Sequence, residues 1–147
     1  MHLPGSDRAT VLQAAVCLSA TWLGLRLLGF RRWKILLDRL LSSSKHSAAT
    51  DPALLPQALQ VTRLQSAAAR HLFFRTNCLE QAMTLYFLLC RRGIAAELRF
   101  GARKQAARLE AHAWVACLGV SLNEDLGEHR HFLPFDGVNP LMETLPD

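Results

Sequence analysis

The stretch FRTNCLEQAMTLYFLLCRRGI, residues 74–94, carries the clearest helical pattern in the chain. Its apolar side chains recur at helical spacing, at Leu79, Ala82, Met83, Tyr86, Leu89 and Cys90. Thr76 or Asn77 can cap the start of such a helix, and Gly93 can end it. The stretch therefore predicts a helix that begins at about Cys78.

The residues before this helix also have a helical pattern. Residues 9–41 carry apolar side chains with Arg and Lys at helical intervals, which predicts one or two amphipathic helices broken near Gly29. The apolar run 11–25 ends at Arg26, short of the ~20 residues that span a membrane, so we expect a buried helix. We divide the chain into N-terminal amphipathic helices at 1–45, a small-residue connector at 46–60 and a core domain at 61–147.

The residues after Gly93 predict a small antiparallel sheet. Apolar and β-branched residues indicate strands at 94–102, 111–118 and 120–124. The basic segment RKQAARLE, residues 103–110, is expected to form a loop between the first two strands, and Gly119 a tight turn between the last two. Helices followed by such a meander belong to the α+β fold class.

Composition and charge exclude several classes of protein. The net charge of the 147-residue chain is +5, and the excess lies in residues 1–45, with seven Lys and Arg against two acids. This basic part suits contact with a membrane surface, whereas no nucleic-acid-binding motif accompanies it, so no nucleic-acid partner is expected. Four cysteines without paired spacing, and no cleavable signal, predict reduced thiols in the cytoplasm. His129 and His131 lack a third ligand at suitable spacing, so we expect neither a metal nor a cofactor.

Cys78 is the candidate nucleophile, because a thiolate is stabilised by the unpaired amides and the dipole at the start of a helix. The other cysteines, Cys17, Cys90 and Cys117, are expected to be small core residues. A nucleophilic thiol needs a base and a group that orients the base. His112 begins a predicted strand, and Glu124 with Asp125 beside it follows twelve residues later, although a lone His on a strand is more often a structural residue.

The segments NCLEQAMTLYFLLCRRGIAAELRFGA and EAHAWVACLGVSLNE together resemble a known family. They are similar to the transglutaminase-like, papain-type peptidase domain of the lasso-peptide maturation proteins, the B or B2 proteins, over about residues 61–136. The resemblance implies a helix bearing the cysteine packed on an antiparallel sheet. It also implies Cys78 as nucleophile, His112 as general base and acid, and an acid on the next strand. Counting from His112 favours Glu124 as that acid, and a one-residue bulge would substitute Asp125.

The family role implied is that of a leader peptidase acting on a ribosomally made precursor peptide. Its partners would be the precursor, a separate winged-helix leader-recognition protein of the B1 type, and the ATP-dependent macrolactam synthetase called the C protein. The chain has no room for a fused recognition module, so it resembles the stand-alone B2 type. Two other hypotheses stay open, which are a transglutaminase-like acyl transferase or amide hydrolase and a non-catalytic peptide-binding module.

Overall fold

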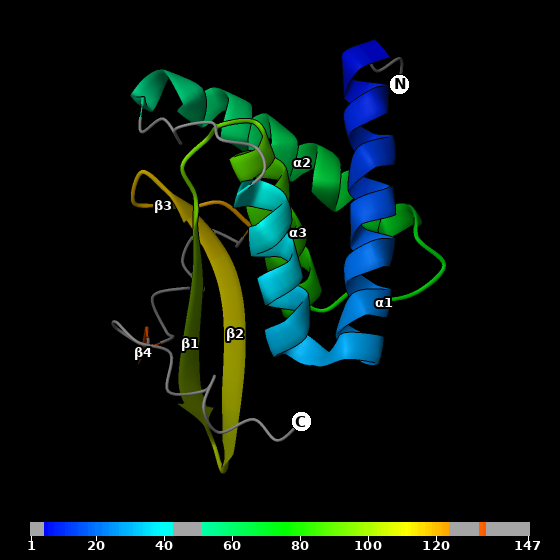
Figure 1. Ribbon diagram of the computed structural model, residues 1–147. Coiled ribbons are helices and arrows are strands. Elements are labelled where there is room, and N and C mark those ends of the chain that lie inside the picture. The colour runs from blue at the N-terminus through cyan, green and yellow to red at the C-terminus, as the bar shows by residue number, and fades with distance from the viewer. Residues whose placement is uncertain (1–4, 43–50, 124–132, 135–147) are drawn as a thin grey trace.

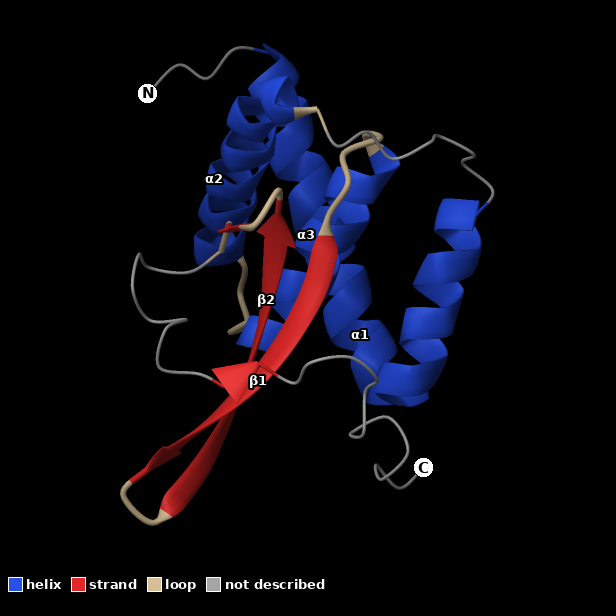
Figure 2. Cartoon of the chain, turned by 90° about the vertical axis from the view of Figure 1, so that its left-hand side faces the viewer, coloured by secondary structure: helices blue, strands red, loops and turns tan. Residues whose placement is uncertain are grey.

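The computed structural model describes residues 5–42, 51–123 and 133–134. Its helices precede its strands along the chain, and the strands lie in front of the helices when the sheet faces the viewer (Figures 1 and 2). The elements are α1 (Gly5–Ser42), the 3₁₀ turn η1 (Pro52–Leu54), α2 (Leu55–His71), α3 (Cys78–Arg91), β1 (Glu97–Gln105), β2 (Arg108–Cys117), β3 (Val120–Ser121) and β4 (Leu133–Pro134). This arrangement confirms the α+β class, with the cysteine-bearing helix α3 packed on an antiparallel sheet.

Helix α1 folds back on itself at Gly29, as the sequence predicts. Gly29 has φ 74° and ψ 170°, a conformation that an L side chain rarely adopts. The second half of α1 then runs back beside the first (Figure 1). The two halves approach so closely that a Cβ at Gly24 would collide with the Trp33 ring. The absence of a side chain at Gly24 therefore allows the helical hairpin to close.

Helix α2 begins sooner than the expected connector allows. The connector predicted at 46–60 ends by residue 51, because Pro52 opens η1 and Pro56 lies in the first turn of α2. The first turn of a helix tolerates proline, since the amide hydrogen that proline lacks has no acceptor there. These prolines therefore mark helix starts and not an extended linker.

The sheet has the strand order β3-β2-β1-β4, with every described pair antiparallel. The loop expected at 103–110 is wrong, because β1 and β2 continue to Gln105 and Arg108 on either side of a short turn. Ala106 takes φ 53° in that turn. An ion pair between Arg103 Nε and Glu110 Oε2, 2.7 Å long, joins the two strands near the tip. The basic segment is therefore the end of a long hairpin.

The core lies between the helices and one face of the sheet. Its larger cluster combines Ala14 and Leu18 of α1 with residues of α2, α3 and β2. The N-terminal helix therefore covers the same core as the cysteine-bearing helix. The outer side of α1 remains uncovered, with Leu12 67% and Leu27 71% exposed.

Candidate active site

Cys78 is the first residue of α3, and its helix start is held by reciprocal hydrogen bonds. The Asn77 side chain accepts a hydrogen bond from the Glu80 amide at 2.9 Å, and the Asn77 amide donates to Glu80 Oε2 at 2.9 Å. This is a capping box, which confirms the predicted cap. Gln81 donates its amide hydrogen to the Asn77 carbonyl at 3.1 Å. The amides of Cys78 and Leu79 keep no protein acceptor among the described residues, so two donors lie beside the thiol.

Glu80 also ties this helix start to α1. Its side chain is only 2% exposed and accepts a hydrogen bond from Arg26 Nη1 at 3.1 Å. The Arg26 guanidinium lies 4.0 Å from the centre of the Trp22 ring, and Trp22 packs against Phe74 with ring centres 4.6 Å apart. The segment before Cys78 is therefore fixed from α1. Sequence reasoning missed Glu80, although its place three residues after Asn77 is the sequence signal of a capping box.

Of the other three cysteines, which the sequence predicts in the core, Cys117 is buried and Cys17 and Cys90 are half-buried. Burial is the largest influence on each of these thiols and raises the pKa of Cys17, Cys90 and Cys117 above the usual value. A hydrogen bond with Tyr86 acts in the opposite direction on the Cys90 thiol, but burial prevails. A raised pKa keeps a thiol protonated at neutral pH, so these three are poor nucleophiles.

His112 lies on β2, opposite Gly101 of β1, and its ring stacks on that of Trp114 at 6.1 Å and 19°. Ala113 and Val115 belong to the core cluster beneath α3. Since side chains alternate along a strand, His112 and Trp114 form the row on the opposite side of β2.

Along the helix axis, His112 is close to the level of Cys78. The Ile94 amide donates to the Leu89 carbonyl, so the chain turns back beside the end of α3. The distance from Leu89 to Cys78 is about 16 Å along the helix, which about five residues of strand cover. About five residues after Ile94, the chain has reached the middle of β1, where Phe100 pairs with Ala113 of β2. The structure thus brings α3 and β2 together, but His112 lies on the side of β2 opposite to the Ala113 and Val115 row that packs beneath α3. The described contacts do not join the thiol to the imidazole, and their pairing stays a prediction.

The predicted acids Glu124 and Asp125 lie outside the described residues, and so do His129 and His131. The described chain beside β2 ends at Asn123. There the Leu122 amide donates to the Val115 carbonyl at 3.0 Å, and Asn123 Oδ1 accepts from the Val115 amide at 2.8 Å. The assignment of the third catalytic residue therefore remains a prediction from sequence.

The comparison with protein families decides the class of the chain. A family model described as Transglutaminase-like superfamily matches residues 20–135. The chain belongs to this superfamily. The match begins within α1, so the superfamily domain includes much of the helical hairpin as well as α2, α3 and the sheet. The comparisons with curated proteins and with solved structures found no match.

Membership of the transglutaminase-like superfamily supports a coarse catalytic function. The superfamily generally includes cysteine hydrolases and transferases, whose chemistry passes an acyl group through a thioester. A cavity of about 520 Å³ adjoins the start of α3 and is lined by Thr76 and Gln81, which flank Cys78 in sequence. Gln81 Nε2 donates to Thr76 Oγ1 at 3.0 Å, so its side chain holds the preceding segment in place.

Proposed function

We propose that this chain is a cysteine leader peptidase, which removes the leader from a ribosomally made lasso-peptide precursor before the macrolactam is closed. One observation carries the proposal above all: the only thiol at a helix start among the described residues, Cys78, opens a capped helix that packs on the strand bearing His112. Membership of the transglutaminase-like superfamily supports the class of chemistry. The segments NCLEQ and AHAWV supply the more specific likeness to lasso-peptide proteins.

In the proposed reaction, Cys78 Sγ attacks the carbonyl carbon of the scissile bond while His112 takes the thiol proton. The oxyanion that forms accepts hydrogen bonds from the free amides of Cys78 and Leu79, and one such donor contributes roughly 3–4 kcal/mol in the transition state. His112 then gives the proton to the leaving amine of the core peptide. The leader stays on Cys78 as a thioester until water attacks and releases it as a carboxylic acid.

The third catalytic residue is proposed to be Glu124, with Asp125 as the alternative. Its carboxylate would orient the imidazole and stabilise the imidazolium that forms after proton transfer. Parallel Glu124→Gln and Asp125→Asn variants distinguish them, since loss of the orienting acid lowers kcat by orders of magnitude while leaving the unfolding temperature unchanged.

The proposed partners follow from this role. The chain would receive its precursor with the help of a winged-helix leader-recognition protein of the B1 type, and it would hand the freed core peptide to the ATP-dependent C-type macrolactam synthetase. A cytoplasmic location is proposed for these steps, because the precursor and ATP are both available there.

The decisive experiment compares cleavage of a leader-containing precursor by the wild type, Cys78→Ala and Cys90→Ala, with the winged-helix protein present and the products read by mass spectrometry. We expect leader release by the wild type and by Cys90→Ala, whose mutated thiol is half-buried in the last turn of α3, at the other end of the helix from Cys78. Cys78→Ala should release none. Cleavage by Cys78→Ala at the wild-type rate would refute the thiol mechanism.

Analysis of the reaction products and substitution of His112 distinguish the peptidase from the two other hypotheses. Transfer of the acyl group to an added amine, in place of release as an acid, would favour the transglutaminase-like acyl transferase. Binding of the precursor without any turnover would favour the non-catalytic peptide-binding module. His112→Ala should abolish turnover, while His71→Ala, at the exposed end of α2, should not.

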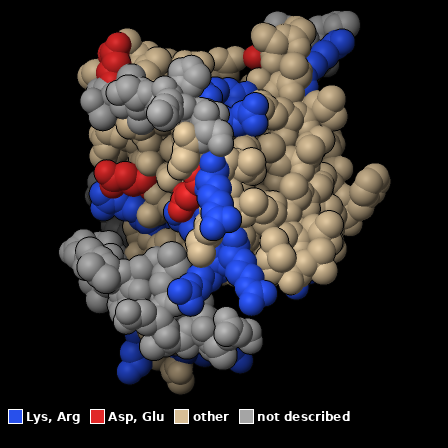
Figure 3. Space-filling view, in the orientation of Figure 1, with Lys and Arg blue, Asp and Glu red and all other residues tan. Residues whose placement is uncertain are grey.

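A membrane-surface contact is a second candidate role, and the outer side of α1 favours it. By length and composition α1 could cross a membrane, with a mean hydropathy of 1.6 over its most apolar window, of which only 22% is buried. A band of Lys and Arg lies beside a broad uncharged surface (Figure 3), the pattern of a helix that lies on anionic lipid. Sedimentation with anionic vesicles at low salt tests it, and recovery only in the supernatant would refute it.

A further inference from the structure

The cavity that adjoins the start of α3 has the features of a substrate subsite. It lies between the last turns of α2, the segment 72–76 and Gln81 of α3, with a volume of about 520 Å³. Cys78 does not line the cavity, but residues three apart on a helix share one side of it, so Cys78 lies on the side of α3 whose Gln81 lines the cavity. A peptide held at the nucleophile would therefore extend into the cavity.

The wall nearest Cys78 is fixed by contacts within the fold. Thr76 accepts a hydrogen bond from Gln81 Nε2, and the Phe74 ring packs on Trp22 of α1. A wall that is already ordered binds a ligand without the entropic cost of ordering a loop. The cavity is thus a preformed feature of the capped helix start.

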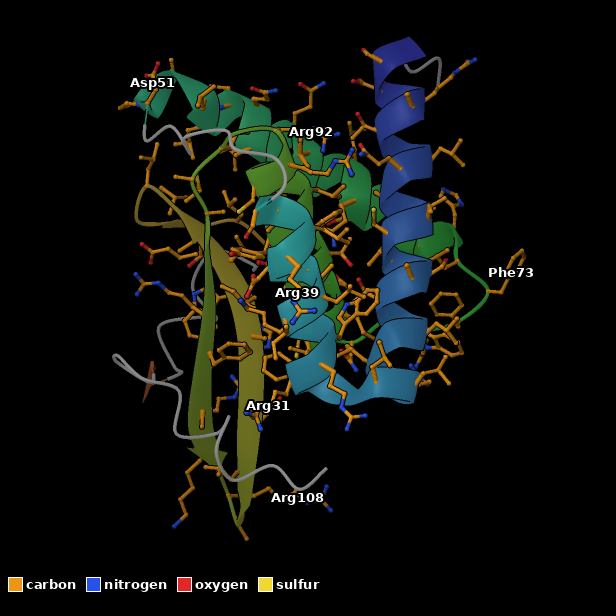
Figure 4. The ribbon with its side chains drawn as sticks, viewed as in Figure 1. Arg31, Arg39, Asp51, Phe73, Arg92 and Arg108 are labelled. Atoms are coloured by element: carbon orange, nitrogen blue, oxygen red, sulfur yellow. The ribbon has the colours of Figure 1, made fainter. Side chains whose placement is uncertain are left out.

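The chemical character of the lining points to a ligand that carries both negative charge and apolar groups. Arg70 and Arg75 line the cavity, and neither forms an ion pair with any described residue. No acidic side chain is part of the lining. Phe73 is fully exposed and projects away from the helices (Figure 4), which leaves its ring available to an apolar side chain.

We propose that this cavity is a subsite that binds an acidic residue of the peptide substrate, with a neighbouring apolar residue against Phe73. The proposal rests on the proposed peptidase function, whose substrate it specifies. Arg70 and Arg75 bind the carboxylate by charge-assisted hydrogen bonds, and a guanidinium can do so through two parallel contacts. A substrate with glutamine in place of glutamate has nearly the same shape but lacks the charge that the two arginines bind.

The test measures binding without turnover, in the full-length Cys78→Ala protein. The probes are two acetylated and amidated pentapeptides, one alternating leucine with glutamate and the other alternating leucine with glutamine, titrated by calorimetry at low salt. We expect the acidic peptide to bind roughly tenfold more tightly, as charge-assisted hydrogen bonds to two guanidinium groups imply. Equal affinities, or no binding of either peptide, would overturn the proposal.

Matched variants assign the selectivity to the cavity. The double variant Arg70→Gln, Arg75→Gln should bind both peptides equally, whereas Arg63→Gln, on the same helix but outside the lining, should keep the preference. If Arg63→Gln removes as much of the preference as the double variant, the effect is one of net charge and the subsite is refuted. Unfolding curves of all variants check that each is folded.

The outcome is distinguishable from that of the peptidase test. A protein that selects the acidic peptide but never cleaves a precursor would keep the subsite and reject the peptidase. A protein that cleaves the precursor through Cys78 but binds both pentapeptides equally would keep the peptidase and reject the subsite.

Discussion

Replacing Glu80 by alanine should destabilise the protein although this side chain belongs to no hydrophobic cluster. The carboxylate is 2% exposed, accepts the Asn77 amide at 2.9 Å and accepts Arg26 Nη1 at 3.1 Å. The Asn77 side chain still accepts from the backbone amide of residue 80, so the loss falls on the part-buried Asn77 amide, which costs about 1–3 kcal/mol without its acceptor. Arg26 is 52% exposed, so water replaces its partner and the ion pair adds little.

The expected loss is therefore about 2 kcal/mol in the free energy of unfolding, or roughly 4–8 °C in Tm for a domain of this size. Urea unfolding followed by circular dichroism measures it. Glu80→Gln retains a side chain that can complete the capping box and should cost about half as much. The control is Glu97→Ala, an acid 68% exposed that pairs with Arg99 on its own strand, for which we expect a change within about 0.5 kcal/mol. If the free energies of unfolding of Glu80→Ala and Glu97→Ala agree within about 0.5 kcal/mol, Glu80 does not stabilise the helix start.

Three further predictions concern reactivity, pH and packing. Iodoacetamide at neutral pH should modify Cys78 first, because burial raises the pKa of the other three thiols; peptide mapping that finds another cysteine labelled first would contradict this. Burial raises the pKa of Tyr86 to about 12 from 10.0, so the folded state holds this proton more tightly and the stability it contributes is present below pH 10 and lost as pH rises through 12. Tyr86→Phe should therefore flatten the fall of unfolding free energy over that pH range, and an unchanged slope would argue against it. Gly24→Ala should cost about 1–3 kcal/mol by forcing Trp33 aside, whereas Gly5→Ala, with open space around it, should leave Tm unchanged.

The sequence predicted the elements whose signals are local. The start of α3 has its cap at Asn77 and its stop at Gly93 within a few residues, and the break in α1 has its own glycine. The hairpin tip at 103–110 was missed, because charged residues there hide the alternation and Ala106 is a weak turn residue. Its strands are joined by contacts between Arg103 and Glu110, which neither strand reveals alone.

The same distinction holds for the candidate site. Cys78 could be assigned to a helix start from its immediate neighbours, and the superfamily match agrees with the kind of chemistry expected. The contact between Arg26 and Glu80 joins residues 54 apart in sequence and depends on how α1 packs, so no local sequence pattern predicts it. The cavity likewise combines the end of α2 with the start of α3, and only the fold brings these together.

The contact between α1 and the helix start at Cys78 changes how the N-terminal helices are understood. A helix pair that only shields a core contributes apolar side chains, and α1 does so through Ala14 and Leu18. Arg26 goes further, since its partner Glu80 also completes the cap of the helix that begins at Cys78. A displacement of α1 would therefore disturb the Arg26–Glu80 ion pair, and with it the capping box that holds the helix start at Cys78. Because the superfamily match also begins within α1, this helix is better regarded as part of the transglutaminase-like domain than as an appendage to it.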